Sequence, residues 1–167
     1  MTAEQYRKWS RPFREHKSLK NALIWYNYIA TALIAAAYFA TLIALAVLWD
    51  VRGLRILFAP AVGFILITLL RKLVNRPRPY ETLEIEPLLE KKKSGCSCPS
   101  RHTFSAFSIA VALFYVSPVA GSITAVFGAA LAYSRVIAGV HFPSDVILGG
   151  ALGIALTSLG LYLPLPI

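Results

Sequence analysis

The sequence predicts an all-α protein, a polytopic transmembrane helical bundle of about five spans with an amino-terminal interfacial segment. Hydrophobic residues make up 57% of the chain and charged residues only 15%, against roughly 25% charged in an average soluble domain. Apolar stretches of near-spanning length recur along the chain, and the charge gathers in short segments between them. A soluble domain of 167 residues cannot bury this much apolar surface in one core, so a membrane protein is expected.

Five apolar stretches are the candidate spans. They run from Ala22 to Trp49, Leu54 to Leu70, Phe104 to Val116, Val119 to Tyr133 and Val146 to Leu163. The third and fourth are short and meet at Ser117-Pro118, where the proline predicts a break between two antiparallel helices. The later spans contain small residues that favour close helix packing in lipid, namely Gly121, Gly128, Ala129, Ala130, Gly149, Gly150 and Gly153.

The segment from Met1 to Lys20 is basic and carries Tyr6, Trp9 and Phe13 at roughly helical spacing. This pattern indicates an interfacial segment whose partner is anionic lipid. The first span lacks the features of a cleaved secretory signal and predicts a permanent anchor. The net charge of +9 does not indicate nucleic acid, because no recognisable nucleic-acid-binding motif accompanies it. We expect one membrane-embedded domain over residues 1–167, multi-pass in the cell membrane.

The remaining charge is concentrated in three segments next to the spans. "RKLVNRPRP" (71–79) closes the second span, "CPSRH" (98–102) opens the third, and "SRVIAGVHFPSD" (134–145) lies between the fourth and fifth. A chain that crosses the membrane five times brings all three segments to the same face. Ionisable groups at such a boundary are costly and need a reason. The sequence therefore predicts one pocket built from three distant segments.

The residue types of this pocket favour phosphoryl chemistry. Its arginines would be Arg71, Arg78, Arg101 and Arg135. Guanidinium groups match phosphate oxygens through paired, charge-assisted hydrogen bonds, so several of them at one point favour a phosphoryl ligand. Ser100, just before the third span, and the backbone amides of that helix start would add further donors to the anion.

Two histidines and one aspartate in the same segments supply candidate catalytic groups. A neutral imidazole can attack phosphorus, while a second, protonated imidazole can give its proton to the departing oxygen, so His102 and His141 allow both roles. Asp145 follows His141 by four residues. If that segment is helical, the two share a face, and the carboxylate can hold one ring proton so that the other nitrogen is free to attack.

These segments resemble the signature of the type 2 phosphatidic acid phosphatase superfamily, which includes lipid phosphate phosphatases, bacterial acid phosphatases and vanadium haloperoxidases. That signature reads Lys-x6-Arg-Pro, then Pro-Ser-Gly-His, then Ser-Arg-x5-His-x3-Asp. Here the three parts run from Arg71 to Pro79, from Pro99 to His102 and from Ser134 to Asp145, in the same order and with the same internal spacing. The resemblance covers residues 71–145 and points to the bacterial membrane lipid phosphate phosphatases.

The resemblance implies a role for each matched residue. His141 would be the nucleophile that forms a phosphohistidine, His102 the general acid and Asp145 the partner of His141. The phosphate would be held by Arg71, Arg78, Ser100 and Arg135. No metal and no cofactor are implied. The expected reaction is metal-independent hydrolysis of a membrane lipid phosphate such as phosphatidic acid, phosphatidylglycerophosphate or a polyprenyl diphosphate.

The sequence departs from the family pattern at two positions. Arg71 stands where the pattern has lysine, and Lys72 is adjacent, so either side chain is a candidate for the phosphate contact. Arg101 replaces the glycine of the second motif, so the backbone there does not need a conformation that only glycine adopts. The side chain of Arg101 is expected to be an extra phosphate ligand.

Other interpretations of the same residues stay open at this point. His102, His141 and Asp145 could hold a metal ion, although the surrounding arginines would repel a cation. Cys96 and Cys98 form a single C-x-C without a second ligand pair and are expected to be loop thiols. The segment 80–93 is expected to be a solvated loop, with a lid over the lipid tail as the alternative.

Function and orientation also keep alternatives. The same covalent intermediate would serve a lipid phosphotransferase, and arginines without chemistry would serve an anion channel or transporter. On the five-span topology the pocket face carries 15 of the 17 basic residues, all except Arg52 and Arg55, which favours a cytoplasmic face. The bacterial enzymes of the resembled family commonly act on the outer face. The sequence leaves the face and the oligomeric state undecided.

Overall fold

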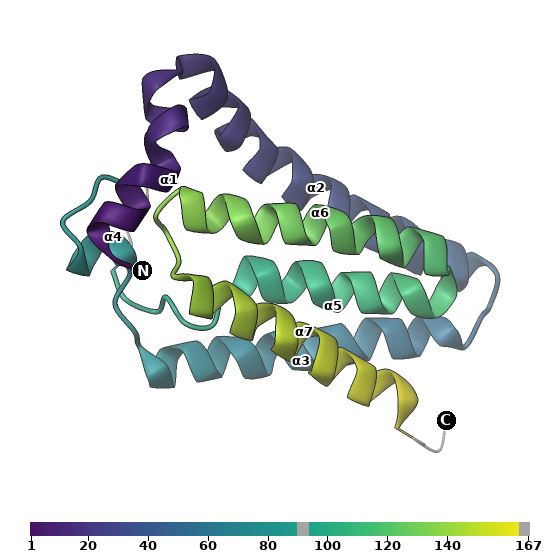
Figure 1. The fold of residues 1–167 in the computed structure, drawn as a ribbon. Helices are drawn as coiled ribbons and strands as arrows, with labels where there is room; N and C mark the ends of the chain where they lie inside the picture. The colour runs from purple at the N-terminus through teal and green to yellow at the C-terminus, as the bar shows by residue number, and fades with distance from the viewer. Residues whose placement is uncertain (90–93, 164–167) are drawn as a thin grey trace.

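The computed structural model describes residues 1–89 and 94–163, and the regular secondary structure of this part of the chain is entirely helical, without a strand. Figure 1 shows a bundle in which the long helices run side by side. The elements are α1 (Ala3–Glu15), α2 (Lys17–Val47), α3 (Arg52–Val74), α4 (Pro79–Thr82), α5 (Arg101–Val116), α6 (Pro118–Ile137) and α7 (Pro143–Tyr162). The predicted all-α class is confirmed.

The long helices coincide with the five predicted spans. Among the described residues, α2, α3, α6 and α7 are long and apolar enough to cross a membrane, and α5 is an apolar helix of 16 residues. The break predicted at Ser117-Pro118 is present, because α5 ends at Val116 and α6 begins at Pro118. Large apolar side chains of α2 such as Trp25, Ile29 and Ile43 are exposed, as expected of a surface that faces lipid.

Helix α5 is the centre of the bundle and packs against α2, α3, α6 and α7. Its contact with α7 depends on two glycines. A β-carbon on Gly149 would lie 2.5 Å from the carbonyl oxygen of Ser100, and one on Gly153 would lie 2.6 Å from that of Phe104. The small residues noted in the sequence therefore let these two backbones approach closely.

Helix α1 packs across the end of the bundle where α4 and the connections around it lie, as Figure 1 shows. It begins with a capping box formed by Thr2 and Gln5. Tyr6 is fully buried, and its hydroxyl donates to the carbonyl of Glu86 at 3.0 Å. The ring of Tyr6 also covers Gly139, whose φ is +73° and whose hypothetical β-carbon would lie 2.7 Å from the tyrosine oxygen. This helix thus holds the connection between α6 and α7 in place.

The segment after α4 is packed and not freely solvated over its described part. Ile85, Leu88 and Leu89 are buried, and the amide of Leu88 donates to the carbonyl of Ala138 at 3.0 Å. The prediction of a solvated loop is therefore wrong for these apolar residues, and Leu88 and Leu89 form a core cluster with the α6–α7 connection and the start of α2. Residues 90–93, which include three lysines of the predicted loop, lie outside the described residues.

Candidate active site

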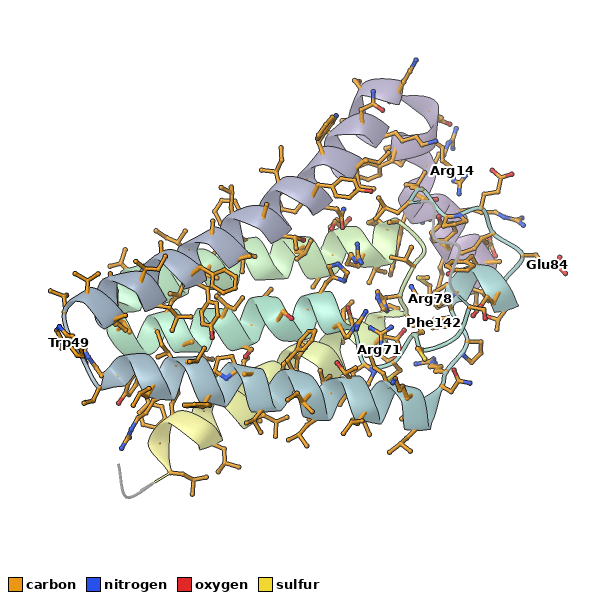
Figure 2. All side chains as sticks on the ribbon, turned by 180° about the vertical axis from the view of Figure 1, so that it is seen from behind. Arg14, Trp49, Arg71, Arg78, Glu84 and Phe142 are labelled. Carbon is orange, nitrogen blue, oxygen red and sulfur yellow. The ribbon has the colours of Figure 1, made fainter. Side chains whose placement is uncertain are left out.

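The three polar segments meet at one end of the bundle. Figure 2 shows Arg71, Arg78 and Phe142 close together at that end, with Trp49 at the opposite end. Hydrogen bonds join the segments directly, because the amide of Ser100 donates to the carbonyl of Asp145 at 2.9 Å. The predicted convergence of three distant segments is thus present in the fold.

His141 and Asp145 form the most deeply buried part of the site. His141 is 1% exposed and Asp145 is fully buried. The Nδ1 atom of His141 lies 3.7 Å from Oδ2 of Asp145 and 3.5 Å from the hydroxyl oxygen of Ser97, which itself donates to Oδ2 of Asp145. The carboxylate and the serine hydroxyl thus face the same nitrogen of the imidazole ring.

The two residues approach each other through a helix cap and not through a shared helical face. Helix α7 begins at Pro143, so His141 lies before the helix and before its N-cap residue, Phe142. Asp145 is the third residue of the helix, and its Oδ2 accepts a hydrogen bond from the amide of Phe142 at 2.9 Å. The condition for a common helical face is therefore not met, and the two side chains approach each other through the cap of α7 instead.

Arg76 is a partner of Asp145 that the sequence argument did not identify. Its Nη1 atom lies 2.8 Å from Oδ1 of Asp145 and 2.8 Å from the hydroxyl oxygen of Ser144. Its guanidinium carbon also lies 4.4 Å from the centre of the Phe142 ring. Arg76 therefore neutralises the buried carboxylate from the side opposite to Ser97 and His141.

Arg71 and Arg78 are buried and donate to carbonyl groups of the loop before α5. Arg71 donates to the carbonyl of Cys96, and Arg78 donates to that of Gly95 at 3.1 Å and to that of Val140 at 3.5 Å. The two guanidinium groups therefore link the first and second motif segments, and Arg78 also reaches the residue next to His141. Lys72, the alternative to Arg71, is exposed, so the structure favours Arg71 as the inward-facing side chain.

Arg135 lies between α2 and His102. Its Nη1 donates to Oδ1 of Asn27 at 3.2 Å, and its Nη2 lies 2.8 Å from Nδ1 of His102. The side chain is 4% exposed, and its Nε has no hydrogen-bond partner among the described residues. A buried N–H donor without a partner is costly unless a ligand supplies the acceptor. Arg135 is therefore poised to bind an anion.

Ser100 and Arg101 occupy different positions although they are adjacent. Ser100 is fully buried at the N-cap of α5 and accepts a hydrogen bond from the Thr103 hydroxyl at 3.2 Å. Arg101 is half-buried, and its guanidinium carbon lies 6.0 Å from the ring centre of Phe64 on α3. The structure thus brings Ser100 next to Asp145, whereas Arg101 points towards an apolar wall.

The electrostatic setting determines the protonation of the groups at the helix connections. Burial, aided by the charges of Arg135 and Arg78 and opposed by Asp145, lowers the pKa of His141 from its ordinary 6.5 to about 4, so the ring is neutral at pH 7. Burial raises the pKa of the Cys98 thiol, which therefore stays protonated. Cys96 and Cys98 are both free thiols, as predicted.

Three residues of the site were not among the sequence candidates, namely Ser97, Arg76 and Asn27. Asn27 had a visible signal, because it is the one amide side chain in the stretch from Ala22 to Trp49, and polar groups inside spans are functional by default. Arg76 lies within the first polar segment but outside the matched motif positions. Ser97 had no comparable signal.

The fold defines a multi-pass helical membrane protein with several buried arginines gathered at one end of the bundle. The chain belongs to the PAP2 superfamily, whose sequence pattern matches residues 52–165. The chain is similar to an undecaprenyl-diphosphatase from Sulfolobus acidocaldarius, at 33% identity over 60% of this chain and 50% of that protein. It is also similar to the bacitracin transport permease protein BcrC from Bacillus licheniformis, at 32% identity over 70% of this chain and 61% of that protein. The chain thus spans about half to three fifths of the length of these relatives.

Two solved structures share the fold over nearly the whole chain. The crystal structure of LpxE from Aquifex aeolicus matches with a TM-score of 0.76 and 26% identity, over 96% of this chain and 94% of the other. A transmembrane PAP2-type phosphatidylglycerolphosphate phosphatase from Bacillus subtilis matches with a TM-score of 0.68 and 24% identity, over 94% of this chain and 83% of the other. The resemblance stated from the sequence motifs is confirmed at the level of the family.

Proposed function

We propose that the chain hydrolyses the phosphate of a membrane lipid phosphate through a phosphohistidine intermediate at His141. The observation that carries this proposal is the imbalance of charge in the pocket. Arg71, Arg78 and Arg135 are each at most 6% exposed, and none forms an ion pair with a carboxylate among the described residues. Buried charges need an opposite charge, and the geometry of guanidinium groups suits a phosphoryl group.

The nucleophile in this proposal is Nε2 of His141. Asp145 and Ser97 face Nδ1, so the ring proton stays on that side and the lone pair is on Nε2. The low pKa of His141 keeps the ring neutral and able to attack at pH 7. A P–N bond forms as the P–O bond to the lipid breaks, and water then cleaves the P–N bond to release inorganic phosphate.

His102 is the general acid in this proposal. It touches Arg135, so it lies beside the donors that would hold the phosphoryl group. By donating its proton to the lipid oxygen, His102 would neutralise the negative charge that develops there as the P–O bond breaks. The arginines would offset the charge on the transferred phosphoryl oxygens. Ser100 and the first amides of α5 add neutral donors at the same place.

The names of the relatives support lipid phosphates as the substrate class. One relative is an undecaprenyl-diphosphatase, and two structural neighbours are LpxE and a phosphatidylglycerolphosphate phosphatase. Phosphatidic acid, phosphatidylglycerophosphate and a polyprenyl diphosphate therefore all remain candidate substrates for this chain. None of the residues proposed here for catalysis needs a metal ion, so activity is expected in excess chelator.

The test is a rapid-quench experiment with a ³²P-labelled lipid phosphate and the purified protein in detergent containing EDTA. We expect a phosphoenzyme that is stable in alkali and labile in acid, as phosphohistidine is, and its absence in His141→Ala. Thermal unfolding of the variant checks that it is folded. A phosphoenzyme that persists in His141→Ala, or turnover that requires an added metal, would contradict the proposal. Product analysis with added alcohols distinguishes hydrolysis from phosphotransfer.

A further inference from the structure

An apolar groove of about 700 Å³ lies between α2, α3 and α5. Its walls are formed mainly by hydrophobic side chains from these helices, including Ile34, Phe39, Leu57, Phe64, Phe104 and Ile109. Two residues of different character line the same groove, namely Arg101 and His102 in the first turn of α5. The groove therefore connects the catalytic end of the bundle with its apolar interior.

Arg101 is unusual among the arginines near the site. The guanidinium groups of Arg71, Arg78 and Arg135 each contact a carbonyl, an amide oxygen or a ring nitrogen. Arg101 makes no hydrogen bond or ion pair within the described part of the chain, and its guanidinium carbon lies 6.0 Å from the ring centre of Phe64. A cation in an apolar wall within a membrane bundle is costly and marks a functional position.

The positions of the two histidines indicate where the leaving group departs. In-line displacement at phosphorus places the nucleophile and the leaving group on opposite sides. His141 is buried and does not line the groove, whereas His102 does. If His102 protonates the leaving oxygen, the lipid departs into the groove. Arg101 lines that groove next to His102 and so meets the first atoms of the leaving group.

We infer that Arg101 binds the second phosphate of a lipid diphosphate, the phosphate that stays on the lipid after the terminal one is transferred. This inference rests on the proposed hydrolysis. In this step the P–N bond to His141 forms as the bond between the terminal phosphorus and the bridging oxygen breaks. The electron pair of the broken bond stays on the bridging oxygen, which receives the proton of His102 and leaves as part of the lipid monophosphate. The leaving phosphate is anionic, which suits the guanidinium of Arg101. The alcohol that leaves from a monoester offers it no charge.

Phe64 has a supporting role in this arrangement. Its ring lies under the guanidinium of Arg101 and is part of the groove wall. Stacking of this kind keeps a planar guanidinium oriented without providing a counter-charge. The groove thus gives an anion site at its mouth and apolar surface beyond it, which matches the order of a diphosphate followed by a hydrocarbon chain.

The experiment compares two substrates with the same chain, farnesyl diphosphate and farnesyl monophosphate, by phosphate release in detergent. Wild type is compared with Arg101→Gln, Arg101→Lys and a charge-matched control, Lys20→Gln, whose side chain is exposed. We expect Arg101→Gln to lower kcat/KM for the diphosphate by roughly 10- to 100-fold, the range for a charged hydrogen bond. The loss on the monophosphate should be clearly smaller than the loss on the diphosphate, Arg101→Lys should be intermediate, and the Lys20→Gln control should match wild type on both substrates.

The outcomes separate this inference from the proposed function. Equal losses on both substrates would mean that Arg101 holds the transferred phosphate or the fold, and would overturn the inference. An unchanged diphosphate rate in Arg101→Gln, or a wild type that hydrolyses only the monophosphate, would also overturn it while leaving the proposed hydrolysis intact. Failure of wild type to release phosphate from either lipid would instead overturn the proposed function. Thermal unfolding of each variant serves as the measure of correct folding.

Discussion

The contact between Arg76 and Asp145 can be tested by Arg76→Met. Arg76 is the one partner of Oδ1 of Asp145 among the described residues, at 2.8 Å, and the aspartate is fully buried. Methionine retains an unbranched apolar chain that can still cover the Phe142 ring. The change therefore removes the charge and the hydrogen bonds with little loss of packing.

The expected loss of activity depends on the burial of Asp145 and on the partial exposure of Arg76. A buried polar group that loses its partner costs about 1–3 kcal/mol, and more when it is charged. The Arg76 side chain is 38% exposed, so solvent screens its Coulombic contribution and the lower part of that range is appropriate. A loss of about 1–2 kcal/mol corresponds to a roughly 5- to 30-fold lower kcat/KM. It should fall mainly on kcat, because Arg76 touches Asp145 and not the proposed phosphate donors.

A double-mutant cycle on phosphate release distinguishes this mechanism from a general loss of structure. In the Asp145→Asn background, Arg76→Met should have little further effect, which gives a coupling energy of roughly 1–2 kcal/mol. Arg76→Lys should recover part of the rate, and Lys8→Met, which removes an exposed basic residue, should match wild type. Additive losses in the double variant, or an effect on KM alone, would refute the reasoning.

Further predictions concern the histidines and the topology. If His102 only protonates the leaving group, His102→Ala should reduce turnover of a lipid monoester roughly 10²- to 10⁴-fold but spare p-nitrophenyl phosphate. The variant His141→Ala should abolish turnover of both substrates. Equal losses on both substrates for His102→Ala would show that the role assigned to His102 is wrong. In a background without cysteines, exposed Lys8→Cys and Ser94→Cys should react with an impermeant thiol reagent from one side of the membrane and Trp49→Cys from the other, while labelling of all three from one side would contradict the five spans. The pKa of His141 is about 4 when folded and near 6.5 when unfolded, so the unfolded chain takes up the proton first and stability should fall by roughly 3 kcal/mol as pH drops from 6.5 to 4. Thermal unfolding of His141→Gln should lack this part of the pH dependence, and an identical pH profile would contradict the assignment.

The spans were predictable because each depends on local composition. Apolar length defines a helix that crosses the membrane, and Pro118 defines the break after Val116. The meeting of the three motif segments also followed from the sequence, since connections that are separated by an even number of spans lie on the same face of the membrane. These features need no knowledge of side-chain contacts.

The contacts within the site depend on how distant segments pack against one another, so they were harder to predict from the sequence. Arg76, Ser97 and Asn27 reach the catalytic groups from three different segments, and no local pattern states which side chain points inward. The pairing of His141 with Asp145 was predicted, but its geometry comes from the cap of α7. The sequence Phe-Pro-Ser-Asp carried that signal, with proline at the first helical position and aspartate at the third.

The surplus of buried positive charge leads to a final prediction about stability. Arg71, Arg78 and Arg135 are buried without a carboxylate partner among the described residues, and Nε of Arg135 has no acceptor there. An anion that supplies these interactions binds the folded state alone and should stabilise it, by about 2.7 kcal/mol at a concentration of 100 times its Kd. For a chain of this size that is a rise in Tm of roughly 5 °C or more. Inorganic phosphate should therefore raise the Tm of the detergent-solubilised protein more than chloride at equal ionic strength, and Arg135→Gln should reduce the difference. Equal shifts with both anions would indicate general screening and would remove this support for a phosphate pocket.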